Sequence, residues 1–122
     1  MILVDTSVWI DHFRVADRVL ADRLGSVRVL VHPFVIGELA LGNLRQRHEI
    51  LAALADLPRS VVATDAEVLH FVERESLFGR GIGYIDAHLL AAARLTAGTR
   101  LWTRDRRLRA VAETLGVESA EA

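Results

Sequence analysis

Short apolar segments alternate along this chain with longer segments that have helical periodicity. Each apolar segment is mostly aliphatic, and a capping residue or a proline follows it before the next helical pattern begins. This alternation favours a parallel sheet with helices packed on both of its faces. In sheets of this kind, ligands bind beyond the carboxyl ends of the strands. The pattern therefore predicts an α/β fold and the edge of the sheet at which a functional site lies.

The boundaries of the expected elements follow from the same pattern. The predicted strands cover residues 2–4, 27–31, 60–63 and 100–103, and Gly116 and Val117 are candidates for a small edge strand. The predicted helices cover residues 6–23, 33–44, 48–57, 64–78, 84–97 and 105–115. A loop is expected at residues 79–83. Thr64 and Glu67 have the spacing of a capping box, which marks the start of one of these helices.

The size and composition of the chain narrow its class. Its 122 residues match the length of one domain, so we expect a single domain over residues 1–122. No apolar segment approaches the roughly 20 residues that span a bilayer, and we recognise no signal peptide. We therefore expect a cytoplasmic protein without membrane contact. Because the sequence contains no cysteine, disulfides, thiolate zinc sites and cysteine nucleophiles are excluded.

Four acidic residues stand in apolar surroundings. Asp5 and Asp105 each follow a predicted strand, and Glu38 and Asp86 share a helical face with apolar residues. A desolvated carboxylate is unfavourable unless a hydrogen bond, a positive charge or a metal ion compensates it. If the four carboxylates converge, their mutual repulsion favours a bound cation. This set points to a metal-dependent phosphoryl-transfer enzyme.

Capping is the alternative explanation for two of these acids. Asp5 can cap the helix that follows it, and Asp105 opens another helix, where a negative charge is favoured by about 0.3–1 kcal/mol. Ser7 and Thr103 lie beside them in the sequence. These two hydroxyls either position a metal-bound water and the carboxylates or serve as ordinary cap and strand-end residues.

Arginine supplies all fifteen basic side chains, and there is no lysine. Guanidinium groups suit bidentate contacts with phosphate. Arg104 and Arg107 lie beside Asp105, and Arg80 lies in the glycine-containing loop, so a polyanionic substrate and a solvated surface both fit. The histidines show neither metal-ligand spacing nor partners for a catalytic triad, and we assign no role to His12, His32, His48, His70 or His88.

Four blocks of the sequence resemble the PIN-domain ribonucleases, specifically the VapC-type toxins of bacterial toxin–antitoxin pairs. The blocks are MILVDTSVWIDHFR, PFVIGELALGNLR, RGIGYIDAHLLAAARL and LWTRDRRL, in the order and spacing of the family. The resemblance implies a three-layer α/β/α sandwich around a central parallel sheet. It implies that Asp5, Glu38, Asp86 and Asp105 form the active site with Mg²⁺ or Mn²⁺. Many relatives carry another acid where this chain has Arg107, which favours one persistent ion over two.

On this basis, the expected activity is metal-dependent hydrolysis of tRNA, rRNA or mRNA. Asp5, Asp86 and Asp105 are the expected metal ligands, and Glu38 is a ligand or helps to activate the nucleophile. The family also implies a cognate antitoxin and a homodimer. The alternative from another class is a catalytically weak or inactive PIN module that binds RNA or a protein. Phosphatases of the haloacid-dehalogenase pattern and receiver domains fit less well, because the chain has Ser7 where the former need a second Asp, and no lysine.

Overall fold

Three parallel strands form the central sheet of the protein, which we describe from a computed structural model over residues 1–121. The strands are β1 (Ile2–Val4), β2 (Val29–Leu30) and β3 (Arg100–Trp102), in the order β2-β1-β3. In register, Leu3 of β1 pairs with Leu30 of β2 and with Leu101 of β3. The predicted α/β fold with a parallel sheet is confirmed.

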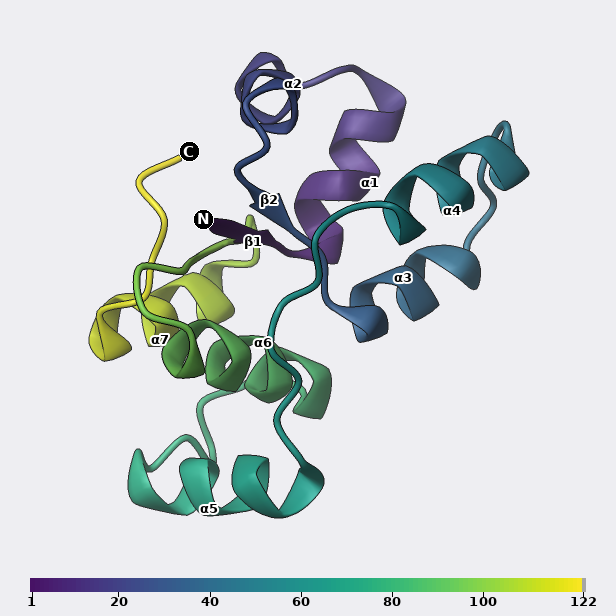
Figure 1. Ribbon diagram of the computed structural model, residues 1–122. Coiled ribbons are helices and arrows are strands. Elements are labelled where there is room, and N and C mark those ends of the chain that lie inside the picture. The colour runs from purple at the N-terminus through teal and green to yellow at the C-terminus, as the bar shows by residue number, and fades with distance from the viewer. Residues whose placement is uncertain (122) are drawn as a thin grey trace.

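Seven helices surround this sheet within the described residues. They are α1 (Thr6–Arg14), α2 (Arg18–Gly25), α3 (Pro33–Ala40), α4 (Arg47–Ala55), α5 (Asp65–Arg74), α6 (Tyr84–Leu95) and α7 (Arg106–Leu115). In Figure 1, helices α1 to α4 lie to one side of the strands and helices α5 to α7 to the other. The outermost helix, α5, packs against α6, which in turn contacts β3. The alternation of strands and helices therefore produces a layered molecule.

Helix α6 forms much of the core. All seven residues from Ala87 to Ala93 are buried, because the helix is apolar on nearly every side. Asp86, at the exposed start of this segment, is only half-buried. The small alanine side chains allow α6 to lie close to its neighbours, so the position of Asp86 is fixed by a well-packed helix.

The predicted helix over residues 6–23 is wrong, because α1 and α2 are separate helices. Val15 is extended, with φ −140° and ψ 116°, and ends α1. Asp17 then caps α2 by accepting a hydrogen bond from the Leu20 backbone N–H at 2.9 Å. An aspartate in this sequence context is equally typical of a solvated residue inside a helix. The sequence therefore did not indicate that a second helix begins after Asp17.

Three predicted strands are also shorter or absent. Residues 60–63 form no strand, and an isolated parallel bridge joins the preceding residue, Arg59, to Val31. Strand β2 begins at Val29, since Val27 has a left-handed backbone with φ 56°. In place of the small edge strand expected to begin at Gly116 and Val117, there is an isolated bridge between Leu101 and Glu118.

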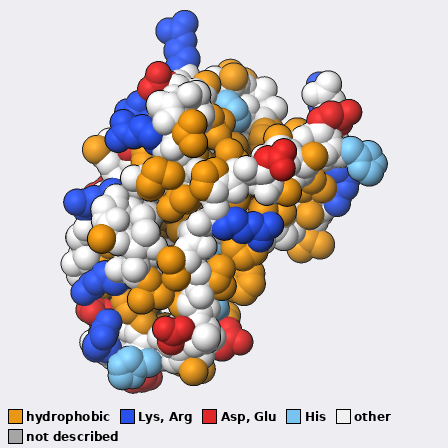
Figure 2. Space-filling model, in the orientation of Figure 1, with side chains coloured by type: hydrophobic (Ala, Val, Ile, Leu, Met, Phe, Trp, Pro, Cys, Tyr) orange, Lys and Arg blue, Asp and Glu red, His pale blue; other side chains and the backbone are white. Residues whose placement is uncertain are grey.

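Many apolar side chains remain at the surface. Figure 2 shows them spread over one face of the molecule, with the basic side chains mainly toward the edges of the view. Leu41 and Val15 are 91% and 80% exposed. Among residues 1–121, no helix has the length and hydropathy needed to cross a bilayer.

Candidate active site

The carboxyl ends of β1 and β3 bring two distant segments side by side. Val4 pairs with Trp102, and the backbone N–H of Asp5 donates to the Trp102 carbonyl at 2.9 Å. This register places Asp5 next to Thr103, which follows β3. The predicted location of a site at this edge of the sheet therefore holds two of the residues that the sequence identified.

Asp5 is 6% exposed and is the most buried of the four acids. Its Oδ2 accepts hydrogen bonds from Ser7 Oγ at 2.7 Å and from Thr103 Oγ1 at 2.8 Å. It also accepts a longer bond from the Ser7 backbone N–H at 3.4 Å, in the capping geometry of α1. Two hydroxyls and an N–H thus fix one oxygen, while Oδ1 receives no hydrogen bond within residues 1–121.

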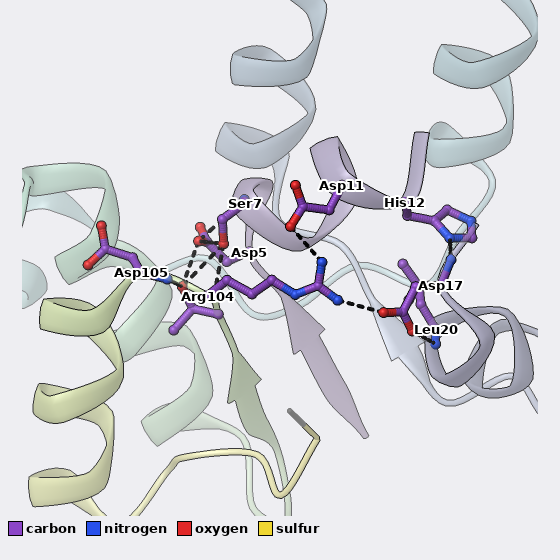
Figure 3. Close-up of polar contacts among 9 residues, drawn as sticks. Asp5, Ser7, Asp11, His12, Asp17, Leu20, Arg104 and Asp105 are labelled. Atoms are coloured by element: carbon purple, nitrogen blue, oxygen red, sulfur yellow. Dashed lines mark hydrogen bonds and ion pairs between the residues drawn. The ribbon is translucent and has the colours of Figure 1, made fainter. Parts of the chain in front are cut away.

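The same two hydroxyls also hold the segment that follows β3. Thr103 Oγ1 accepts from the Asp105 backbone N–H at 3.0 Å, and Ser7 Oγ accepts from the Arg104 backbone N–H at 3.0 Å. Figure 3 shows this cluster of short contacts around Asp5 and Ser7. Ser7 and Thr103 therefore connect the first acid of the chain to the last of the four.

Asp105 caps α7 through its Oδ1, which accepts from the Leu108 backbone N–H at 2.9 Å. Glu38 lies on α3, and its Oε1 accepts from Thr6 Oγ1 at 2.7 Å. Both carboxylates are exposed, so the expectation that Glu38 is buried with an apolar stripe is wrong. Its helical neighbours Phe34 and Leu41 are themselves exposed, because this face of α3 is not covered.

Asp86 is half-buried in the first turn of α6, and its Oδ2 accepts from the Gly83 backbone N–H at 2.9 Å. Burial is the largest influence on this carboxyl and raises its pKa, while the Gly83 hydrogen bond opposes that rise. The charges of Asp5, Asp105 and Glu38 raise the pKa of Asp86 further. All three other acids thus lie near enough to repel Asp86, which shows that the four carboxylates share one region.

Each of the four carboxylates follows one pattern. One oxygen is held by a donor from the chain, and the other receives no hydrogen bond within the described residues. No arginine in that part of the chain forms an ion pair with any of them. Oriented carboxylates with an open oxygen and no basic partner suit a hard divalent cation such as Mg²⁺ or Mn²⁺.

The carboxylates do not form a closed ligand cage. Within residues 1–121, no three acidic or histidine side chains approach one another closely enough to hold an ion in their present conformations. The other acids can still repel Asp86 at this separation, since charges interact over distances larger than a coordination bond. Binding of an ion would require side-chain rotation, which is easiest for the exposed Glu38 and Asp105.

The side chain of Arg104 extends away from Asp5 and Asp105 and toward Asp11 and Asp17, as Figure 3 shows. Its guanidinium donates to Asp11 at 2.6 Å and to Asp17 at 2.5 Å, and these two bonds connect the end of β3 to α1 and α2. His12 completes the network, since its Nδ1 accepts from the Asp17 backbone N–H at 2.9 Å, and burial lowers its pKa. Nothing in the sequence indicated this network, because Arg104 is far along the chain from Asp11 and Asp17.

Two buried histidines without an assigned role pack against the exposed aromatic side chains of Phe34 and Tyr84. His32 and His88 are 0% and 1% exposed, and the His88 ring packs edge-on against Phe34 and Tyr84. Burial, with a smaller contribution from the charge of His88, lowers the pKa of His32 to about 4. His88 Nε2 lies 3.2 Å from Asp65 Oδ1. Tyr84 and His88 are one helical turn apart, but nothing in the sequence links them to His32.

Two comparisons with known proteins bear on the family of this chain. The family model described as "PIN domain" matches residues 2–114. Two curated proteins, both named Ribonuclease VapC32 and from two strains of Mycobacterium tuberculosis, are each 52% identical to this chain over 121 residues. The alignment covers 99% of this chain and 98% of each relative.

Proposed function

This chain belongs to the PIN-domain family, in its VapC branch, and from that membership we propose that it is a Mg²⁺- or Mn²⁺-dependent endoribonuclease. The reaction is hydrolysis of an RNA phosphodiester bond. We further propose that the protein is the toxin of a toxin–antitoxin pair. The observation that supports this function most directly is the set of four carboxylates, each with one oriented oxygen and one open oxygen and none paired with an arginine of the described chain.

Asp5, Asp86 and Asp105 are the proposed metal ligands. When bound, a divalent ion supplies positive charge for the phosphate oxygens and lowers the pKa of water. Asp5 is the best-ordered of these ligands, because Ser7 and Thr103 fix its carboxylate plane. The raised pKa of Asp86 indicates that this site favours a neutralising cation.

Glu38 is the proposed acceptor for the proton of the attacking water. It is exposed, and Thr6 holds one of its oxygens while leaving the other open. A carboxylate in such a position can act as a general base or bind the ion through a water.

We propose that Arg80 and Arg107 contact the RNA backbone, since both are exposed and neither forms an ion pair within residues 1–121. The RNA-binding role expected for Arg104 has less support, because two carboxylates already engage its guanidinium. The two carboxylates already offset the positive charge of this guanidinium, which makes it less available to a phosphate.

The remaining expectations about this protein are proposals as well. The substrate is a tRNA, rRNA or mRNA, and the regulator is a cognate antitoxin whose arginine pairs with the acidic cluster. The protein acts in the cytoplasm as a homodimer of single-domain chains. Co-purification with a small protein encoded beside it tests the antitoxin, and light scattering tests the homodimer.

A catalytically weak or inactive PIN module is the second candidate. The observation that favours it is the absence of a closed ligand cage among the described residues. Metal binding separates the two candidates without an activity assay. A rise in melting temperature with Mn²⁺ that Asp105→Asn abolishes supports the nuclease.

The principal test is cleavage of RNA by the purified protein with Mg²⁺ or Mn²⁺. Loss of a residue that only supports a metal ligand lowers activity by about 10–100-fold, and Asp5→Asn should reduce the cleavage rate by more than that. Excess EDTA should abolish cleavage. Asp56→Asn is the matched control, because Asp56 is exposed at the end of α4 and should leave the rate unchanged. Full activity of Asp5→Asn, or activity in EDTA, would refute the proposal.

A further inference from the structure

The side chain of Arg107 lies across the backbone of Gly81. A β-carbon built on Gly81 would lie 2.8 Å from Cδ and 2.9 Å from Nη1 of Arg107. Gly81 also has a left-handed backbone with φ 78°. Only glycine therefore leaves the space that Arg107 occupies.

This contact joins two segments of the candidate site. Arg107 is the second residue of α7 and follows Asp105 by two positions. Gly81 lies in the loop that leads into α6, where the Gly83 backbone N–H donates to Asp86. The guanidinium of Arg107 is thus placed between the segments that supply two of the four carboxylates.

The charge of Arg107 is not used elsewhere in the described chain. Its guanidinium has no hydrogen bond or ion pair within residues 1–121, whereas Arg104 binds two carboxylates and Arg109 pairs with Glu118 at 3.0 Å. Its positive charge therefore remains available to a ligand.

We propose that Gly81 and Arg107 form a phosphate clamp that holds an RNA backbone phosphate beside the scissile one. The inference rests on the proposed function, since it takes RNA as the substrate. A guanidinium binds phosphate through two parallel hydrogen bonds, and packing on the Gly81 backbone restricts the conformations of Arg107 before RNA arrives. The glycine thus preorganises the arginine.

The test is the affinity for a fluorescein-labelled single-stranded RNA, measured by anisotropy at several salt concentrations in the non-cleaving Asp5→Asn background. Arg107→Ala should weaken binding about tenfold, since the lost bonds join charged groups. It should also reduce the slope of log Kd against log salt by about 0.7. Gly81→Ala should have the same effect, because its β-carbon displaces Arg107.

A double variant shows whether Gly81 and Arg107 act on RNA binding together or independently. Gly81→Ala should not weaken binding further in an Arg107→Ala protein, since the contact that it disturbs is already absent. Arg107→Lys should restore part of the affinity, because the charge returns without the planar fork. Circular dichroism checks that each variant is folded.

The chain supplies a matched control for each substitution. Gly79 has a similar left-handed backbone, with φ 72°, but a β-carbon there would meet no atom within 4 Å. Gly79→Ala should therefore reproduce the backbone strain without displacing Arg107. Arg109→Ala removes the same charge from the same helix, but that charge is already paired with Glu118.

The outcomes distinguish the clamp from the proposed function. The clamp is refuted if Gly81→Ala and Gly79→Ala have the same RNA affinity. It is also refuted if Arg107→Ala changes the melting temperature but has the same salt slope of RNA binding as Arg109→Ala. RNA cleavage by the wild type together with such a result refutes the clamp alone. Failure of the protein to bind RNA at any salt concentration refutes both proposals.

Discussion

Thr103 does more for the site than a strand-end residue needs to do. Its hydroxyl donates to Asp5 at 2.8 Å and accepts from the Asp105 backbone N–H at 3.0 Å, and the residue is 3% exposed. A hydroxyl can do both at once, and an aliphatic side chain of the same shape can do neither. Thr103 therefore sets the orientation of one proposed ligand and the backbone position of another.

Thr103→Val should lower metal-dependent activity by about 10–100-fold, the usual cost of removing a partner of a metal ligand. It should also reduce the free energy of unfolding by about 1–3 kcal/mol, because the buried Asp5 carboxylate loses one of its two hydroxyl donors and the part-buried Asp105 N–H loses its acceptor. Activity as a function of Mn²⁺ concentration and urea unfolding measure the two effects. If the variant needs more Mn²⁺ for half-maximal activity but reaches a normal maximal rate, the effect lies on metal affinity.

The matched control is Thr99→Val, at the other end of β3. Thr99 is 4% exposed, and its Oγ1 is buried without a hydrogen-bond partner in the described residues. Its replacement by Val should leave stability unchanged or raise it by up to about 1 kcal/mol, and activity should not change. Equal losses at Thr99 and Thr103 would mean that the effect at Thr103 is general to β3.

Among the elements, the junction of α1 and α2 depends on Asp17. This residue caps α2 through Oδ1 and binds Arg104 through Oδ2, and its side chain is 20% exposed. The Leu20 N–H is the largest influence on the carboxyl and lowers its pKa, and Arg104 lowers it further. The corner between the helices is thus attached to the end of β3.

Asp17→Ala should reduce the free energy of unfolding by about 2 kcal/mol, since it removes both the cap and the ion pair. Asp17→Asn retains a capping oxygen and should cost about half as much. The lowered pKa stabilises the native state at neutral pH, and that stability is lost as pH falls through it, so the variants should converge in acid. Urea unfolding at several pH values tests this, with the 70%-exposed Asp22→Ala as the control.

At the scale of the whole molecule, the carboxylate site opposes stability. One of the four acids lies on α3 and the others lie at the starts of α1, α6 and α7. Burial raises the pKa of Asp86 most, and the charges of the other three acids raise it further. A raised pKa means that the native state binds a proton more readily than the unfolded chain, so stability falls as pH rises through that range. The fold tolerates this repulsion because the burial of α6 along most of its length stabilises the native state.

Asp86→Asn should therefore raise the melting temperature in EDTA by about 4 °C, which corresponds to about 1 kcal/mol for a chain of this size. The amide oxygen keeps the bond from the Gly83 N–H. With Mn²⁺ present, the wild type should gain stability and the variant should not. Differential scanning fluorimetry with and without Mn²⁺ measures both effects. A variant less stable than wild type in EDTA would show that repulsion at Asp86 does not limit the stability of the native state.

The elements follow largely from local patterns in the sequence. The three aliphatic residues of β1 predict a buried strand, and Leu101 and Trp102 supply the apolar part of β3. The start of α5 was predicted from its capping box, in which Thr64 and Glu67 bond each other's backbone at 3.1 and 2.9 Å. Local signals fail where contacts from elsewhere decide the conformation, as at Asp17.

The sequence alone determined which residues are candidates for the chemistry, because acids that interrupt apolar patterns mark positions that packing does not require. Only the tertiary structure decided their partners. The register of β1 and β3 places Thr103 against Asp5, two long-range ion pairs occupy Arg104, and a glycine backbone supports Arg107. Such contacts join residues far apart in the chain, so their geometry exists only after the sheet has formed.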